Sequence, residues 1–320
     1  MEICLMIEGQ EGVTWEQWLA LARACERLGF DGLFRSDHYL SFDRPGARGT
    51  LDAWTTLAGL AAVTERIRLG TMVSPATFRH PSVLAKSVVT ADHISGGRVE
   101  LGMGAGWFER EHEGFGFPFP SAGERFDVLA EQVEIVHRLW DRDEGEVTFE
   151  GDHHRLDAVE ALPKGVQDPH PPLILGGGAG PRAAALAARW ADEYDVVYVD
   201  PAETRAARRR LAGACEAIGR DPASLRLSLM TGAVIAGDRR ELEQRVAAVM
   251  EREGESGDVG DAIEAWREDR IVGTVDDVLA RLTDYAGAGV QRVLLQHLVH
   301  EDLEMLELIG EEILPAAASL

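Results

Sequence analysis

Short apolar runs alternate along this chain with longer stretches in which apolar residues recur every three or four positions. The runs have the length of buried strands, and the longer stretches have the period of amphipathic helices. The pattern predicts strands at 2–7, 32–35, 67–73, 99–104, 173–175, 196–199, 225–230 and 290–296. It predicts helices at 15–28, 53–63, 81–93, 122–140, 182–190, 202–218, 239–250, 275–285 and 303–314.

Eight strand–helix units in sequence are typical of a parallel sheet, and over this length they favour a closed (β/α)8 barrel. We therefore predict an α/β fold, a TIM barrel with loop insertions, as a single domain over residues 1–320. A small hairpin is expected from 147–149 and 154–156. The acidic, glycine-containing stretch 251–261 is predicted to be a mobile surface insertion.

Composition and charge narrow the function further. The net charge of −23 argues against nucleic acid and anionic membrane surfaces as partners. No apolar run approaches a membrane span and no signal peptide is visible, so we expect a cytoplasmic protein. The three cysteines, Cys4, Cys25 and Cys215, are scattered in apolar surroundings, which fits reduced thiols and neither a disulfide frame nor a metal site.

Two glycine-rich segments follow predicted strands, and in such barrels the active site lies at the carboxyl ends of the strands. Glycines at 102, 104 and 106 remove side chains from the backbone, so that a flat ligand could lie against the peptide planes. Gly176, Gly177 and Gly178 precede a helix, a pattern that suits a phosphate. Each segment could also be a plain turn, and neither matches a Walker or Rossmann motif.

Asp37 and His38 end the second predicted strand, where a histidine can hold or pass a proton near neutral pH. The adjacent carboxylate could orient the histidine, although neighbours on a strand point to opposite faces. We interpret the charge run with Glu109, Glu111 and Glu113 as a solvated face. His297 and His300 lack an evident third ligand, so we expect no metal.

Several motifs occur in one order along nearly the whole chain. They are 29–33 followed by Ser36-Asp37-His38, 67–73, 78–81, 96–98 leading to 102–107, 171–177 and 273–274. In these motifs the chain resembles the bacterial luciferase-like superfamily, and in particular its oxidoreductases that use the deazaflavin coenzyme F420. Relatives with the same barrel use FMN.

The resemblance implies a cofactor in the barrel mouth and a non-prolyl cis peptide at Met72–Val73. It implies phosphate contacts at the backbone of Gly177 and Gly178. The residues expected around the cofactor are Asp37, His38, Thr71, Met72, Val73, Gly104, Ala105, Gly106, Trp107, Gly176, Gly177 and Gly178. The expected catalytic residues are His38 and Asp37, and the expected substrate pocket comprises Glu8, Phe42, Trp107 and the loop 41–49.

The chain departs from the sugar-phosphate dehydrogenases of this family, which carry a glutamate where Trp107 stands and a tryptophan where Phe42 stands. Their proposed acid is missing here, which argues against a sugar-phosphate substrate. The first hypothesis is hydride transfer between coenzyme F420 and a small organic substrate, with His38 handling the proton.

Two alternatives remain open. One is an FMN-dependent two-component monooxygenase, and the other is a non-redox barrel or a non-catalytic flavin-binding protein. The expected partners are a small-molecule substrate, a second copy of the chain, since dimers are common in the family, and a separate flavin or F420 reductase.

Overall fold

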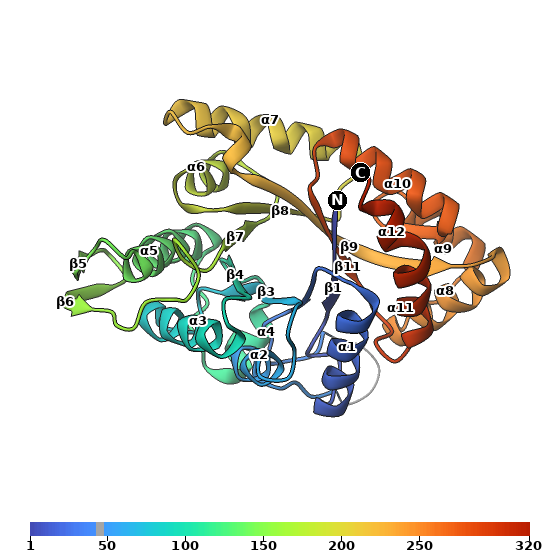
Figure 1. Cartoon of the computed structure of the whole chain (residues 1–320), viewed down its shortest axis with the longest axis horizontal. Coiled ribbons are helices and arrows are strands. Elements are labelled where there is room, and N and C mark those ends of the chain that lie inside the picture. Colours follow the sequence, from blue (N-terminus) through green and yellow to red (C-terminus); the bar gives the residue numbers. More distant parts are fainter. Residues whose placement is uncertain (43–47) are drawn as a thin grey trace.

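A closed parallel barrel forms the centre of the molecule (Figure 1). The computed structural model describes residues 1–42 and 48–320. Within these residues, eight strands pair in the order β9-β11-β1-β2-β3-β4-β7-β8, and the pairing of β8 with β9 closes the ring. This confirms the predicted TIM barrel. The barrel strands are β1 (Glu2–Ile7), β2 (Gly32–Arg35), β3 (Arg68–Pro75), β4 (Val99–Gly104), β7 (Leu173–Gly176), β8 (Glu193–Val197), β9 (Arg226–Ala236) and β11 (Arg292–Gln296).

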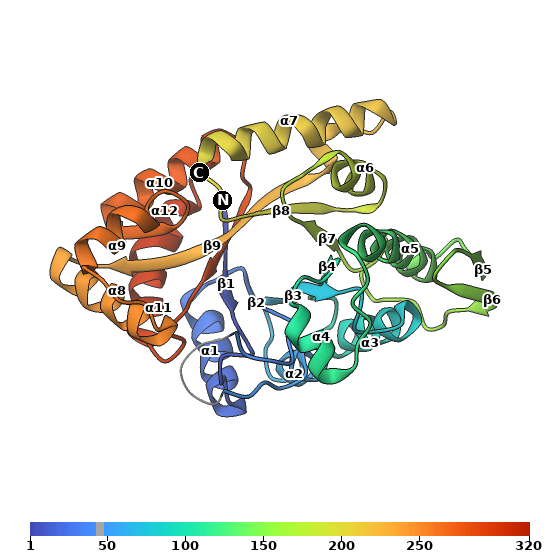
Figure 2. The ribbon, with the colours of Figure 1, turned by 180° about the vertical axis from the view of Figure 1, so that it is seen from behind.

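Helices surround the barrel on all sides, as the front and rear views both show (Figures 1 and 2). They are α1 (Trp15–Leu28), α2 (Ala53–Ala61), α3 (Pro81–Ser95), α4 (Glu109–Phe115), α5 (Ala122–Trp140), α6 (Pro181–Trp190), α7 (Pro201–Ala217), α8 (Arg239–Glu253), α9 (Val259–Trp266), α10 (Val275–Ala288), α11 (Leu303–Leu308) and α12 (Leu314–Ala317). Short helical turns η1 (Pro222–Ser224) and η2 (Ile309–Ile313) complete them. Among the described helices, none has both the length and the apolar character needed to span a bilayer.

The barrel interior is layered. At the amino-terminal end of the strands, Arg292 pairs with Glu100 at 2.6 Å and with Glu193 at 3.2 Å, and all three side chains are buried. Above this charged layer lies an apolar one, formed by Cys4, Met6, Phe34, Met72, Ile174, Met230 and Leu294. The carboxyl ends of the strands lie above the apolar layer and remain open to the cavity described below.

Strand β9 is longer than its neighbours because its two halves have different partners. Its first half pairs with β8 and β11 inside the ring, whereas Ala233–Ala236 pairs with β10 (Ile271–Thr274) outside it. This extension supports α8 and α9. A separate apolar cluster fills the space between them: Val234, Ala236, Leu242, Val246, Val249, Met250, Ile263, Trp266, Val272 and Leu298. We call β10, α8, α9 and the outer half of β9 the annex.

Several predicted elements differ from the observed ones. The sixth barrel strand begins at Glu193 and not at residue 196, because its polar residues Glu193 and Asp195 point into the barrel and are buried. The insertion predicted at 251–261 is shorter in the structure, since α8 continues to Glu253 and α9 begins at Val259, which leaves an exposed loop at 254–258. Helix α4 and strand β10 were not predicted. The predicted hairpin is confirmed as β5 (Glu146–Glu150) and β6 (Arg155–Glu160).

Candidate active site

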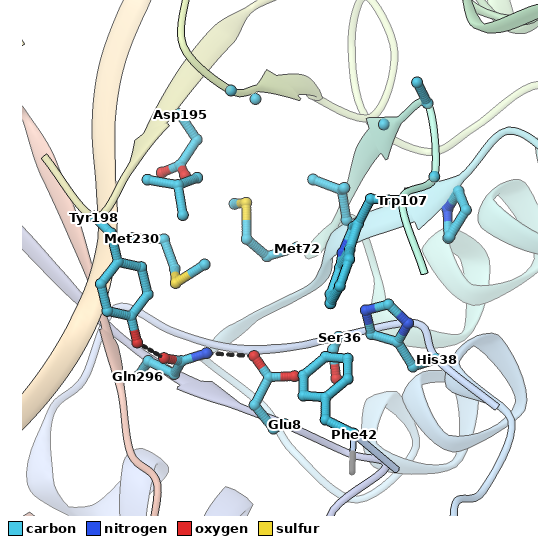
Figure 3. Close-up of a pocket in the computed structure, with 18 of the residues that line it drawn as sticks. Glu8, Ser36, His38, Phe42, Met72, Trp107, Asp195, Tyr198, Met230 and Gln296 are labelled. Atoms are coloured by element: carbon cyan, nitrogen blue, oxygen red, sulfur yellow. Dashed lines mark hydrogen bonds between the residues drawn. The ribbon is translucent and has the colours of Figure 1, made fainter. Parts of the chain in front are cut away.

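A cavity of about 540 Å³ opens at the carboxyl ends of the barrel strands (Figure 3). Residues from every barrel strand or the loop after it contribute to its wall. The described residues that line it are Glu8, Ser36, His38, Phe42, Met72, Val73, Pro75, Gly104, Ala105, Gly106, Trp107, Gly176, Gly177, Asp195, Val197, Tyr198, Met230, Glu253, Arg270, Gln296 and Leu298. The cavity therefore brings together the two glycine-rich segments, His38 and the expected substrate-pocket residues Glu8, Phe42 and Trp107.

His38 has a carboxylate partner that the sequence interpretation missed. Its Nδ1 lies 2.7 Å from Glu111 Oε1, and the Glu111 side chain is fully buried. Burial by itself would lower the pKa of His38, but the hydrogen bond and negative charge of Glu111 outweigh it, so the pKa is raised. The second Glu111 oxygen accepts the backbone N–H of Tyr39 at 2.9 Å. Interpreting Glu111 as part of a solvated face is therefore wrong.

Asp37 lies next to His38 in the sequence but faces away from the cavity. Its carboxylate accepts hydrogen bonds from the Arg79 guanidinium, one of them at 3.1 Å, and from Ser74 Oγ at 2.6 Å. Both residues lie in the loop after β2, which ends at Arg35, and their different hydrogen-bond partners hold them apart. Asp37 therefore anchors the loop that carries His38 and does not line the described wall of the cavity. Thr71 is likewise fully buried, with its hydroxyl donated to Gly102 O at 3.1 Å.

Strands β3 and β4 form one wall of the cavity, to which β3 contributes Met72 and Val73 and the end of β4 contributes Gly104, Ala105 and Gly106. The expected cis peptide is present between Met72 and Val73. A Cβ on Gly104 would lie 2.6 Å from Val73 Cγ2, and one on Gly102 would lie 2.2 Å from Thr71 O. A side chain at either position would push against β3, so the two glycines let β3 and β4 pack closely, and Gly104 adds no side chain to the cavity wall.

The second glycine-rich segment leads from β7 into α6. The N–H of Gly177 donates to Asp195 O at 3.0 Å and that of Ala179 donates to Tyr194 Oη at 2.9 Å, so these two groups are occupied. Arg210 donates to the carbonyls of Gly178 and Ala179 at 3.1 and 3.0 Å. The N–H of Gly178 and the first turn of α6 thus remain for an anion. Gly178 itself lies outside the described cavity lining.

Aromatic rings form the rim on the side of β2 and β4. Trp107 is 63% exposed, and its ring centroid lies 5.2 Å from Phe42 and 5.8 Å from His38. Phe108 completes the cluster, 5.3 Å from Phe42. The bare backbone of Gly104–Gly106 thus leads into an apolar entrance beside the histidine.

A hydrogen-bonded chain runs along the cavity from Tyr198 to Glu8, which lies beside Phe42 of that rim (Figure 3). Tyr198 donates its hydroxyl to Gln296 Oε1, and the Gln296 amide donates to Glu8 Oε1. Gln10 donates to the other Glu8 oxygen at 2.6 Å, and Ser36 donates to Gln10 Oε1 at 2.5 Å. Both oxygens of Glu8 are therefore fixed as acceptors at the cavity floor.

Sequence reasoning missed several lining residues because no local pattern marks them. Tyr198, Arg270 and Gln296 come from the far side of the barrel, and only its closure brings them near His38. Asp195 is also part of the lining. Its burial raises the pKa of its carboxyl group well above the usual range, and Ser228 Oγ donates to Oδ1 at 2.8 Å. The strand that contains Asp195 was predicted to begin at residue 196 and in fact begins at Glu193, so the sequence did not place the Asp195 side chain inside the barrel.

Residues 3–292 match the model of a family described as luciferase-like monooxygenase. An F420-dependent glucose-6-phosphate dehydrogenase of Nakamurella multipartita is 38% identical over 176 residues, 54% of this chain and 50% of that protein. A putative coenzyme F420-dependent oxidoreductase of Mycobacterium tuberculosis is 34% identical over 197 residues, 57% of this chain and 51% of that protein. The matches thus span about half the length of these curated relatives.

Solved structures match over almost the whole chain. The monooxygenase RslO1 from Streptomyces bottropensis has a TM-score of 0.82 at 28% identity, covering 98% of this chain and 99% of that one. An F420-dependent secondary alcohol dehydrogenase has a TM-score of 0.80 at 21% identity, covering 99% and 98%. At 21% identity, the match to the secondary alcohol dehydrogenase shows a shared fold only.

Proposed function

Because this chain belongs to the luciferase-like monooxygenase family, we propose that it is an oxidoreductase that transfers a hydride between coenzyme F420 and a small organic substrate. The F420-dependent relatives from Nakamurella and Mycobacterium support the choice of cofactor. When bound, the deazaflavin supplies the hydride chemistry, and the protein supplies orientation and a proton.

The observation that carries this proposal is the glycine-containing stretch of cavity wall at Gly104 and Gly106, which lies in the same cavity as a protonatable histidine. The residues present fit a planar ring with a phosphate-bearing tail: Gly104 and Gly106 leave the backbone bare, and Val73 presses against it from β3. The Gly178 N–H and the first turn of α6 would receive the phosphate. Asp37 and Thr71 would support this wall from behind.

His38 would donate a proton to the substrate in the reducing direction. Glu111 holds the imidazole through Nδ1, which leaves Nε2 as the donor toward the reacting atom. Glu111 raises the pKa of His38, so the protonated ring persists to higher pH than it would without this carboxylate. By the resemblance described above, Trp107 stands where the family's sugar-phosphate dehydrogenases carry a glutamate, which supports a substrate of another kind.

Fluorescence titration with F420 and with FMN under identical conditions tests the cofactor. We expect tighter binding of F420 by about tenfold or more, a difference of about 1.4 kcal/mol. In turnover assays, His38→Ala should lower kcat strongly and leave the affinity for F420 nearly unchanged. Equal kcat in the wild type and this variant would contradict the role of His38.

An FMN-dependent monooxygenase fed by a separate reductase is the second candidate. The similarity to the monooxygenase RslO1 along the whole chain favours it. Oxygen consumption with reduced FMN, together with no binding of F420, would select it over hydride transfer to an organic substrate.

We also propose that the enzyme works as a homodimer and takes its reduced cofactor from a separate reductase. Sedimentation equilibrium of the purified chain tests the first point, because a single species of monomer mass would refute it. Turnover with chemically reduced cofactor, compared with turnover after adding a reductase, tests the second.

A further inference from the structure

Arg270 is a cation at the cavity whose hydrogen-bonding groups have almost no protein partner. It follows α9 in the annex and lines the cavity together with Tyr198 and Gln296. Its guanidinium carbon lies 4.5 Å from the centre of the Trp266 ring and 5.5 Å from that of Tyr198. These two aromatic faces hold the flat group by cation–π attraction while leaving its edge unused.

The N–H groups along the edge of the Arg270 guanidinium lack a hydrogen-bond acceptor among the described residues, which suggests that a ligand supplies one. No described residue accepts a hydrogen bond from this side chain, and its Nε is buried without a partner. Asp269 Oδ1 is 3.9 Å from Nε, which is longer than a hydrogen bond. Most other arginines near the barrel mouth are bound: Arg79, for example, donates to Asp37 and Asp52. A guanidinium fork left free beside a cavity matches the geometry of an oxyanion.

Tyr198 is held in an unusual conformation that supports this arrangement. Its backbone has a φ of +50°, a value that residues other than glycine rarely adopt. Its hydroxyl is fixed by Gln296, and a Cβ on Gly232 would lie 3.0 Å from that hydroxyl. The ring is therefore locked at the cavity wall, where it presents one face to Arg270. Such backbone outliers cluster at ligand-binding positions.

The position of this pair assigns it to the substrate and not to the cofactor. Figure 3 shows Tyr198 across the cavity from His38 and Trp107, on the side away from the wall formed by β3 and β4. A cofactor on the bare wall would leave the space in front of Tyr198, Met230 and Arg270 for a second molecule. The inference therefore rests on the proposed function.

We propose that Arg270 binds a carboxylate on the substrate of this enzyme. The charges of the described lining favour a monoanion over a phosphate dianion. Arg270 and His38 are the basic residues of that lining, and Glu8, Asp195 and Glu253 are its acidic residues. A single guanidinium fork pairs with both oxygens of a carboxylate. A dianion would meet one arginine in a lining that also contains three acidic residues.

A matched set of probes tests this without turnover. Binding of 4-(hydroxymethyl)benzoate, benzyl alcohol and benzyl phosphate is measured by isothermal titration calorimetry on the full chain, with and without F420. For the wild type we expect the benzoate to bind at least about tenfold more tightly than the alcohol, which corresponds to about 1.4 kcal/mol. The preference should disappear in Arg270→Met and persist in part in Arg270→Lys.

The control is Arg267→Met, which removes an arginine three residues earlier that is already paired with Asp277 at 2.9 Å. It should keep the full preference. Thermal unfolding and F420 titration of each variant show whether the fold and the cofactor site are intact.

Three results would each overturn the proposal. The wild type could bind the benzoate and the alcohol equally, or it could fail to bind the benzoate at millimolar concentration. The preference for the benzoate could also persist in Arg270→Met. Tighter binding of the phosphate than of the benzoate would overturn the choice of a carboxylate. If the benzoate preference is present but F420 does not bind, the proposed cofactor is wrong while the role of Arg270 stands.

Discussion

Replacing Glu111 with glutamine should lower the pKa of His38 and shift the pH dependence of catalysis. The two side chains are 2.7 Å apart, with 11% and 0% of their surfaces exposed, so solvent screens their attraction little. An opposite charge at this distance typically moves a pKa by about 1–3 units. In Glu111→Gln only the burial of His38 and the more distant charges remain, so its pKa should fall below that of the wild type.

NMR titration of the His38 imidazole measures this shift directly and needs no substrate. In the reducing direction, the alkaline limb of the kcat/KM profile should move down by the same number of pH units. The activity of the variant should therefore approach that of the wild type at low pH and fall away as the pH rises. A merely structural role for Glu111 would lower activity equally at all pH values.

Glu113→Gln is the matched control, because Glu113 lies on the same helix with its side chain exposed. It should leave the pKa of His38 unchanged. If Glu111→Gln also leaves that pKa unchanged, the electrostatic reasoning about this pair is refuted.

The same pair should contribute to stability in a pH-dependent way. The pKa of His38 is raised on folding, so its contribution is complete below the unfolded value of about 6.5 and is lost as the pH rises through the folded pKa. The wild type should therefore exceed Glu111→Gln in stability by more at acidic than at alkaline pH.

Three further predictions concern the barrel core, acid stability and the cofactor wall. Arg292→Met should destabilise the fold by about 3–5 kcal/mol in urea unfolding, because it leaves the carboxylate of Glu100 buried without its main partner. His297 is fully buried with its pKa lowered to about 4, so stability should fall by about 3 kcal/mol as the pH drops from 6.5 to 4, where the unfolded state takes up the proton first. Urea unfolding of His297→Gln should show a flatter dependence. Gly104→Ala would place a Cβ 2.6 Å from Val73 Cγ2 and should weaken cofactor binding about tenfold or more in a fluorescence titration.

Each of these has a control within the chain. Arg27→Met removes an exposed ion pair with Glu307 and should cost less than about 1 kcal/mol, and an equal loss in Arg292→Met would contradict the burial argument. Gly114→Ala adds a Cβ with no neighbour within 4 Å and should leave cofactor binding intact. An unchanged pH dependence in His297→Gln would show that other groups determine acid stability.

The barrel could be predicted because its outer packing follows simple periods. The helices bury one face, and strands such as β1 read as continuous apolar runs because both of their faces are covered. Strand β8 was displaced because Glu193 and Asp195 are buried in the interior, where their polarity suggested a loop. In the annex, α8 was predicted, whereas α9 and β10 were missed: the acidic stretch 251–261 was interpreted as a surface insertion, and β10 has only four residues.

Of the candidate active site, the sequence predicted only the residues on the β2, β4 and β7 side of the cavity. Glycines and the Asp37-His38 pair mark β2, β4 and β7 in the sequence, so that wall of the cavity was visible. Glu111 was not, because its burial depends on α4 folding over the barrel mouth. Residues 43–47 of the loop expected to shape the substrate pocket lie outside the described part of the chain.

The way β9 leaves the ring has a consequence for how this enzyme could change during evolution. One continuous strand joins the barrel to the annex, and the annex has an apolar cluster of its own. Glu253 and Arg270 belong to that outer unit, whereas the glycine wall belongs to the barrel. Mutations that repack the annex can therefore change the substrate specificity of the cavity, while the barrel residues that form the proposed cofactor wall stay the same.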